Sequence, residues 1–140
     1  MSALTLITPP SGLVVSVQTA KDHARIEYHE DDELIELYIA QVTALAEQRM
    51  GRAILRQTWE LTLDALDEES TFTVARGRSY EVRLPYPPLA AVTSVKYDDI
   101  DGVEQTLPAA DYWVDAVSEP GRVLPAYGCS WPSTYSMPNA

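Results

Sequence analysis

The sequence predicts an α+β domain: two N-terminal helices, one short and one long, then an antiparallel β region, all preceded by an extended arm. Three observations lead to this prediction. Apolar residues recur at helical spacing over residues 32–50. After Gly51, short segments alternate polar and apolar residues, which is typical of half-buried strands. Near the N-terminus, Pro9 and Pro10 exclude a helix.

The composition favours one modest domain with a single core. The chain has 140 residues, of which 46% are hydrophobic. We expect one connected unit over residues 1–140, with an arm (1–16), a helical part (17–53), a β part (54–128) and an irregular tail (129–140).

The charge is strongly acidic, with a formal net value of −11. This balance argues against a DNA-binding surface, because DNA affinity comes largely from Lys and Arg that replace phosphate counterions. It also argues against docking on an anionic membrane. An acidic surface does suit a protein that lets DNA pass without adhering to it. No apolar run is long enough to span a bilayer, and the N-terminus lacks the features of a secretory signal.

The arm is apolar at Leu4, Leu6 and Ile7. Because so short a segment has no core of its own, it is expected to lie on another surface. That surface is either the chain's own domain, which is the plainer interpretation, or a neighbouring subunit.

The short helix is expected to begin at Thr19, where a hydroxyl N-cap is followed three residues later by Asp22, and to run through Ile26. Asp31 or Asp32 can then cap the long helix.

The long helix is expected from about Asp32 to Met50, with Gly51 as its C-terminal cap. Its apolar stripe is wide enough to pack against two partners, and an intramolecular core is favoured over an oligomer contact. The stripe consists of Ile35, Ile39, Val42 and Ala46, with Leu34, Tyr38, Leu45 and Arg49 beside it.

The β region is read from alternation and turn residues. Strands are expected at residues 58–63, 72–74, 80–84, 92–97, 103–107, 112–114 and 122–124. Turns are expected at residues 64–71, around Gly77 and at 98–102, and the proline-rich segment 85–88 is expected to be a stiff connector.

The segment Asp99-x-Asp101-Gly102-x-Glu104 has the oxygen-rich look of a calcium loop. The spacing does not complete that pattern, since Pro108 stands where a bidentate Glu is needed. Asp and Gly are also the residues that hairpin turns prefer for backbone reasons, so a plain turn is favoured.

Residues with catalytic or metal-binding potential are few and scattered. His23 and His29 are the only histidines, and their separation suits neither a helical pair nor a zinc signature. Cys129 is the only cysteine, so no disulfide forms within the chain. No phosphate loop or nucleophile motif is present. We therefore predict no catalytic residues, no metal and no cofactor.

Arg49, Arg52 and Arg56 form the main basic cluster, at and beyond the end of the long helix. They either compensate the helix dipole and add solubility, or meet an acidic patch on another subunit. The candidate subunit-interface residues are therefore Leu4, Leu6, Ile7, Arg49, Arg52 and Arg56.

Several strings, in this order along the chain, resemble the head–tail connector (adaptor) family of long-tailed phages and gene transfer agents. They are residues 6–10 (LITPP), 17–26 (VQTAKDHARI), 31–35 (DDELI), 49–52 (RMGR), 57–61 (QTWEL), 84–89 (LPYPPL), 92–95 (VTSV), 101–103 (DGV) and 125–128 (PAYG), with Tyr112 and Val114.

The resemblance implies a structural virion protein and not an enzyme. Such proteins are made in the host bacterial cytoplasm and form a ring, generally of twelve copies, below the portal protein at the neck of the virion. The ring extends the channel through which DNA passes without sequence-specific binding, and it offers a platform for the stopper, head-completion or tail protein. Family chains usually continue past the region of Trp131 with a strand and a portal-docking helix. Neither is expected before Ala140, so no docking residues are carried over.

Three other functions remain open from the residues alone. One is a different neck or tail-completion protein, such as a head-completion protein or a tail terminator. Another is a small acidic enzyme, and a third is a regulator that mimics DNA with its acidic surface.

Overall fold

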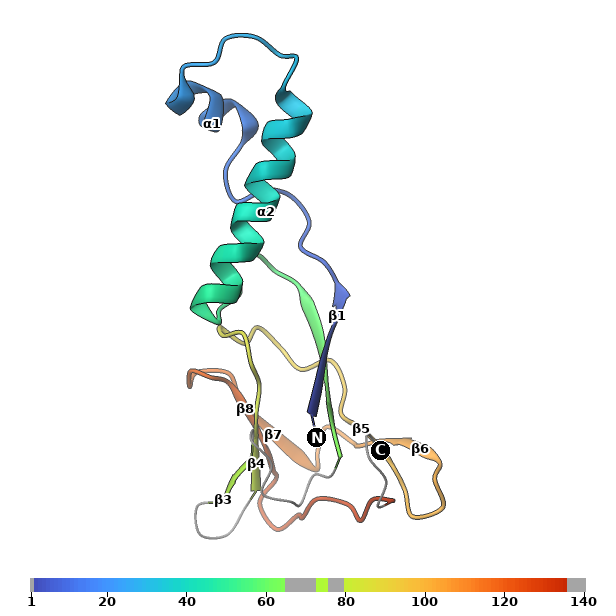
Figure 1. The fold of residues 1–140 in the computed structure, drawn as a ribbon. Coiled ribbons are helices and arrows are strands. Elements are labelled where there is room, and N and C mark those ends of the chain that lie inside the picture. The colour runs from blue at the N-terminus through green and yellow to red at the C-terminus, as the bar shows by residue number, and fades with distance from the viewer. Residues whose placement is uncertain (1, 65–72, 76–79, 136–140) are drawn as a thin grey trace.

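A computed structural model describes residues 2–64, 73–75 and 80–135. Two helices precede most of the strands, and the strand pairing is antiparallel, so the predicted α+β class is confirmed. Figure 1 shows an elongated molecule with the helices at one end and the small sheets at the other. The elements are β1 (Ser2–Thr8), α1 (Val17–Ala24), α2 (Asp32–Met50), β2 (Thr58–Leu63), β3 (Thr73–Ala75), β4 (Tyr80–Arg83), β5 (Lys96–Asp98), β6 (Glu104–Thr106), β7 (Tyr112–Asp115) and β8 (Arg122–Pro125).

The N-terminal arm forms strand β1, which pairs antiparallel with β2. Leu4 lies opposite Leu61, and Leu6 lies opposite Trp59. Because directly opposed residues share one face of an antiparallel pair, these four side chains make one face of the ribbon apolar. The arm thus lies along its own chain, joined to a strand that follows both helices.

The remaining strands form a four-stranded sheet in the order β3-β4-β8-β7 and a two-stranded hairpin of β5 and β6. The core lies here, around the buried side chains of Leu63, Val82 and Val123. The partly buried side chains packed against it are Leu61, Leu84, Val92, Val95, Tyr112 and Trp131. Gly121 is also buried, and a Cβ atom there would lie 2.6 Å from Leu89 Cβ. The sheet therefore packs too closely at Gly121 to admit a side chain.

Some predicted boundaries were wrong. Helix α1 begins earlier than Thr19, because Ser16 is the N-cap and its hydroxyl accepts the N–H of Thr19. It also ends at Ala24 and not at Ile26, because Arg25 is its C-cap with a positive φ of 57°. The strand predicted at 92–97 is only Lys96–Asp98, since ladder pairing begins where Lys96 meets Thr106. The alternation before it instead reflects two valines, Val92 and Val95, that pack on the core from an irregular segment.

Helix α2 has the predicted bounds, and Gly51 caps it with a positive φ of 61°. The predicted stripe is only partly buried: Ile35, Ile39 and Ala46 are half-buried beside the buried Thr43 and Glu47, whereas Val42 is 65% exposed. Strand β2 has the predicted bounds as well. The turns predicted around Gly77 and over 65–71 lie outside the described residues, as does Phe72 at the start of a predicted strand.

Candidate subunit interface

Helix α2 exposes most of its large apolar side chains to solvent. Val42 is 65% exposed, and Tyr38 and Leu45 are at least half exposed. The other large apolar residues exposed on α2 are Leu34, Leu37 and Met50. Its inward side holds Ile35, Ile39 and Ala46, which are half-buried, together with the buried Thr43 and Glu47, so the exposed apolar residues form a second apolar face that the described part of the chain leaves uncovered.

The inner side of α2 is held by polar contacts instead. Glu47 is buried, and its Oε1 accepts the backbone N–H groups of Ile54 at 2.6 Å and Leu55 at 3.1 Å. Thr43 Oγ1 donates to the carbonyl of Ile39 within the helix. The Glu47 carboxylate therefore fixes the chain as it leaves the helix and turns towards β2.

A second polar contact ties α1 to the start of α2. The side chain of Lys21 is only 2% exposed, and its Nζ donates to Asp32 Oδ1 at 2.6 Å. His29 Nδ1 lies 3.0 Å from both Lys21 Nζ and Asp32 Oδ2. The hydrogen bonds from Lys21 and His29 lower the pKa of Asp32 below its usual value. The lowered pKa favours the ionised form of the Asp32 carboxylate, which joins Lys21 of α1 to the start of α2.

The total accessible surface is large for a chain of this mass. It is 9991 Å², whereas a compact monomer of 15.5 kDa exposes about 7200 Å². The elongated shape of the molecule fits this large surface (Figure 1).

The three predicted interface residues of the arm differ in exposure. Leu4 is half-buried against the ribbon, Leu6 is 40% exposed and Ile7 is 54% exposed. Ile7 lies where the register between β1 and β2 shifts, so it has no opposed residue on β2. Leu6 and Ile7 are therefore the part of the arm that is open to another molecule.

The three arginines separate in the same way. Arg52 donates to both carboxylate oxygens of Glu119, at 2.6 and 3.0 Å, and this hydrogen-bonded pair raises the pKa of Arg52 and lowers that of Glu119. Arg49 and Arg56 are exposed and have no acidic partner among the described residues. Arg52 thus joins the end of α2 to the β7–β8 turn, and the other two remain available.

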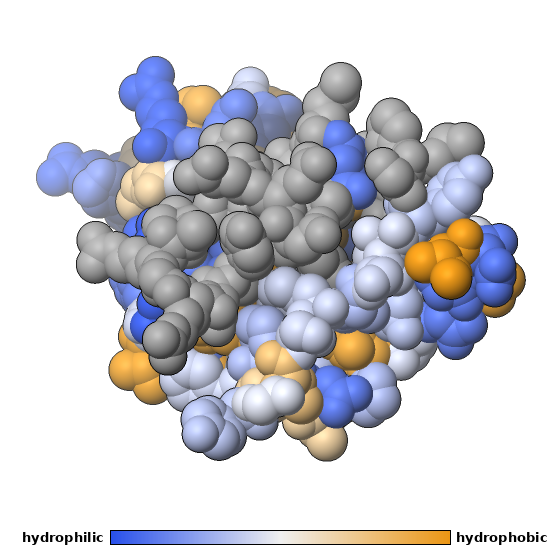
Figure 2. Space-filling view, turned by 90° about the horizontal axis from the view of Figure 1, so that it is seen from below, coloured by the Kyte–Doolittle hydropathy of each residue, from blue (hydrophilic) through white to orange (hydrophobic). Residues whose placement is uncertain are grey.

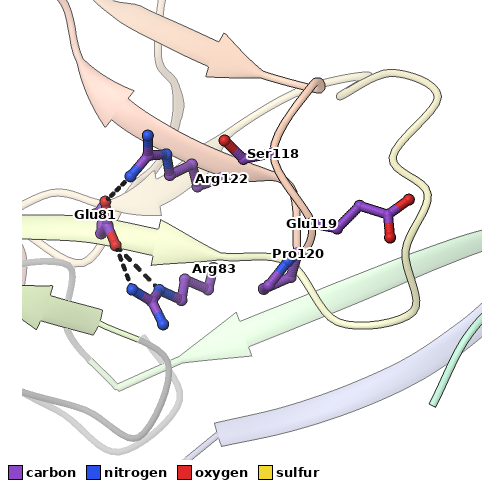
Figure 3. A pocket seen from close by; sticks show the side chains of 6 residues that line it. All are labelled: Glu81, Arg83, Ser118, Glu119, Pro120 and Arg122. Carbon is purple, nitrogen blue, oxygen red and sulfur yellow. Dashed lines mark hydrogen bonds and ion pairs between the residues drawn. The ribbon is translucent and has the colours of Figure 1, made fainter. Parts of the chain in front are cut away.

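A polar pocket of about 220 Å³ lies beside this turn (Figure 3). Within it, Arg83 and Arg122 donate to opposite oxygens of the buried Glu81 carboxylate. Burial opposes ionisation of Glu81, but the two guanidinium groups outweigh it and lower its pKa. Arg122 also donates to Asp115 Oδ2 at 2.9 Å. These charges satisfy one another, so the pocket is a structural ion network.

The oxygen-rich segment after β5 forms a turn. Asp99 Oδ1 accepts the backbone N–H groups of Asp101 and Val103, and Oδ2 accepts Gln105 Nε2. Both oxygens therefore stabilise the hairpin. Within the described ranges, no three His, Cys, Asp or Glu side chains gather as a metal site would require.

The sequence matches the family described as "Phage gp6-like head-tail connector protein" over residues 14–86, slightly more than half of the chain. The chain belongs to this family. No curated protein and no solved structure matches the sequence. The match covers both helices and strands β2, β3 and β4, and it begins after β1.

Membership makes this protein a phage head–tail connector, a structural component of the virion neck that associates with portal and tail proteins. In the parts of the chain that the structure describes, neither helix is long and apolar enough to cross a bilayer.

Sequence reasoning missed an exposed aromatic groove on the β part of the connector. Trp113 on the edge strand β7 and Tyr127 beyond β8 are both exposed beside an open groove of about 690 Å³. The alternation of Tyr112, Trp113 and Val114 did signal that Trp113 points away from its neighbours. Figure 2 shows that the described residues at this end carry hydrophobic patches separated by hydrophilic surface.

Proposed function

We propose that the connector works as one subunit of a ring below the portal, with residues 1–140 acting as a single unit. The ring, for which the family resemblance implies twelve copies, extends the DNA channel and provides the platform for the stopper or tail. The net charge of −11 supports passage of DNA without adhesion.

The observation that carries the proposal is the exposed apolar surface of the helical part. Nothing in the described part of the chain covers Tyr38, Val42 or Leu45, and the total surface exceeds that of a compact monomer. Neighbouring copies in a ring supply cover on two sides of each subunit. Leu6, Ile7, Arg49 and Arg56 are proposed to take part in these contacts, and Leu4 and Arg52 to hold them in place from within the chain.

The test is incorporation of variants into particles. Ile7→Glu and Arg56→Glu are expected to lower the amount of connector in purified particles by at least roughly tenfold. The first places a negative charge in an apolar part of the proposed subunit contact, and the second reverses the charge of a basic residue there. Quantitative mass spectrometry of particles measures the amount, and electron microscopy of the neck locates it.

The matched controls are Ile100→Glu and Arg25→Glu. Ile100 is an equally apolar exposed residue in the β5–β6 turn, and Arg25 is an exposed arginine that caps α1. Both controls are expected to enter particles normally. Normal incorporation of Ile7→Glu and Arg56→Glu, or absence of the wild-type connector from particles, would overturn the proposal.

A further inference from the structure

The open groove beside β7 carries aromatic side chains and no charge. Its lining residues are all uncharged, and Tyr112, Trp113 and Tyr127 are its aromatic members. Trp113 is 57% exposed and Tyr127 is fully exposed. Strand β7 has a strand neighbour on one side only, so the groove lies at the edge of the sheet, where another molecule can approach. Exposed Trp and Tyr side chains of this kind are enriched in protein interfaces.

A carboxylate without a cation lies at one end of the groove. The N–H of Ala126 donates to the carbonyl of Asp111 at 2.9 Å, which extends the β7–β8 ladder by one pair and sets Asp111 on the same face as Trp113. Asp111 Oδ1 lies 4.0 Å from Sγ of Cys129, one of the lining residues. No described Lys or Arg side chain pairs with Asp111. The groove thus suits a guanidinium group beside apolar atoms, because a carboxylate and an aromatic face both attract a cation.

Arg56 carries a guanidinium group that is open to such a contact. Among the described Lys and Arg residues, Arg25, Arg49 and Arg56 have no acidic partner. Arg25 caps α1 and Arg49 lies within α2, so both belong to the helical end of the molecule. Arg56 instead comes two residues before Thr58, the first residue of β2.

Exposed apolar residues lie at the same end of the β1–β2 ribbon as Arg56. Thr58 pairs with Thr8, so Arg56 comes to the end of the ribbon at which Ile7 and Pro9 flank Thr8. Ile7 is 54% exposed, and Pro9 is exposed as well. Extended proline segments are among the ligands that aromatic grooves bind. We call Ile7, Pro9 and Arg56 the ribbon-end patch.

The ribbon-end patch and the groove of one chain lie apart. Strand β1 runs from the sheet end of the molecule towards the helices, whereas β7 lies at the sheet end (Figure 1). The two surfaces therefore complement each other in charge and in apolar character, but they do not meet within one copy.

We propose that the ribbon-end patch of one connector binds the aromatic groove of the next copy. Arg56 lies against Asp111 and Trp113 of that copy, and Ile7 and Pro9 lie against its Tyr127. The opposite charges of Arg56 and Asp111 favour this approach between two chains of net charge −11.

The contact rests on the proposed function and names the surface that receives the arm and Arg56. It joins two different surfaces, so each copy uses its patch on one side and its groove on the other, and the contact repeats as a ring requires. Because the patch and the groove lie at different levels of the elongated molecule, the long axis of each subunit is inclined to the ring axis (Figure 1).

Charge exchange tests the contact in purified particles. Asp111→Arg, like Arg56→Glu, is expected to lower the amount of connector by at least roughly tenfold, because it sets two like charges against each other. The double variant Arg56→Glu/Asp111→Arg restores the pair in the opposite sense and is expected to return the amount to within about twofold of wild type. Quantitative mass spectrometry of the particles measures all three.

The matched control is Arg56→Glu/Asp101→Arg, which places the new arginine in the exposed turn after β5 instead. This variant is expected to enter particles as poorly as Arg56→Glu alone. If Arg56→Glu/Asp111→Arg enters equally poorly, Arg56 meets a different surface and the proposed contact is wrong.

Cross-linking gives a second readout that leaves both charges in place. Pro9→Cys and Tyr127→Cys are combined in a Cys129→Ser background, which removes the one native thiol. A short bismaleimide is applied to particles, since it joins thiols that lack the geometry of a disulfide. The doubly substituted connector is expected to give a ladder of dimers, trimers and larger species, because each copy is linked to two neighbours. Either cysteine alone is expected to leave the connector monomeric.

Particles that hold normal amounts of the doubly substituted connector but yield no ladder would overturn the contact and leave the ring in place. Absence of the wild-type connector from particles would instead overturn the proposed function, so the two failures are told apart.

Discussion

The β part of the connector buries a cluster of apolar side chains, and the helical part does not. The β part buries Leu63, Val82 and Val123 around one core. In residues 17–53 the buried side chains are Lys21, Thr43 and Glu47, all polar or charged; Ile35 and Ile39 are only half-buried, and most of the other large apolar side chains are exposed. The β part is thus stabilised by its own packing, whereas the helical part is shaped by hydrogen bonds and leaves its apolar area for another molecule.

The two parts of this small domain are therefore stabilised by different interactions. Burial of apolar area is the main favourable contribution to folding, so a region without it depends on caps, hydrogen bonds and its covalent link to a stable neighbour. Glu47 provides such a link at the end of α2, and Arg52 provides another through Glu119. The apolar stripe is then free to contribute to association.

The largest expected effect comes from the same substitution made in both parts. Leu63→Ala should lower the free energy of unfolding by about 2–5 kcal/mol, because it leaves a cavity in the core, where Leu63 is 8% exposed. Leu45→Ala, at a residue that is 50% exposed, should change it by no more than about 0.5 kcal/mol. Urea unfolding of dilute, monomeric protein measures both.

Two probes make this comparison sharper. The described helices report through far-ultraviolet circular dichroism. The three tryptophans report on the β part, since Trp59 and Trp113 belong to it and Trp131 packs against its core. Equal losses from Leu63→Ala and Leu45→Ala would mean that the two parts share one core, contrary to the comparison above.

An intermediate effect is expected from Glu47→Ala. The change leaves the N–H groups of Ile54 and Leu55 without their acceptor, which should cost about 1–3 kcal/mol of unfolding free energy. Glu36→Ala removes an exposed carboxylate from the same helix and serves as the control. A loss from Glu47→Ala no larger than that from Glu36→Ala would show that solvent replaces the buried carboxylate.

The smallest effect is a pH dependence that arises in the β part. Hydrogen bonds from Ser118 and from Arg122 hold the pKa of Asp115 well below its usual value. The folded state therefore binds fewer protons than the unfolded state in acid. The contribution is complete above the ordinary carboxyl pKa of about 3.9, and it is lost as the pH falls below that value.

Asp115→Asn should accordingly flatten the fall of unfolding free energy below about pH 4, as followed by urea titrations at several pH values. Asp101→Asn, in the exposed turn after β5, is the control. An acid slope that Asp115→Asn leaves unchanged would assign the acid sensitivity to other carboxylates, such as Asp32 in the helical part.

Local chemistry was enough to predict the elements whose partners lie nearby in the chain. Helix α2 was predicted with its observed bounds, because its acidic start and Gly51 act within one helical turn of its ends. Strand β2 was predicted from alternation, which depends only on its own residues. The start of α1 was missed because Ser16 and Thr19 both make acceptable caps, and only the backbone conformation selects Ser16.

The tertiary structure decided which surfaces remain open. The pairing of β1 with β2 and the contact between Arg52 and Glu119 join residues far apart in the chain, so no local pattern determines them. The apolar period of α2 is the same whether the helix packs in its own domain or against another molecule. Sequence alone therefore established a helix that is apolar on more than one side, and the path of the whole chain decided that Ile35 and Ile39 lie inward and that Tyr38, Val42 and Leu45 stay exposed.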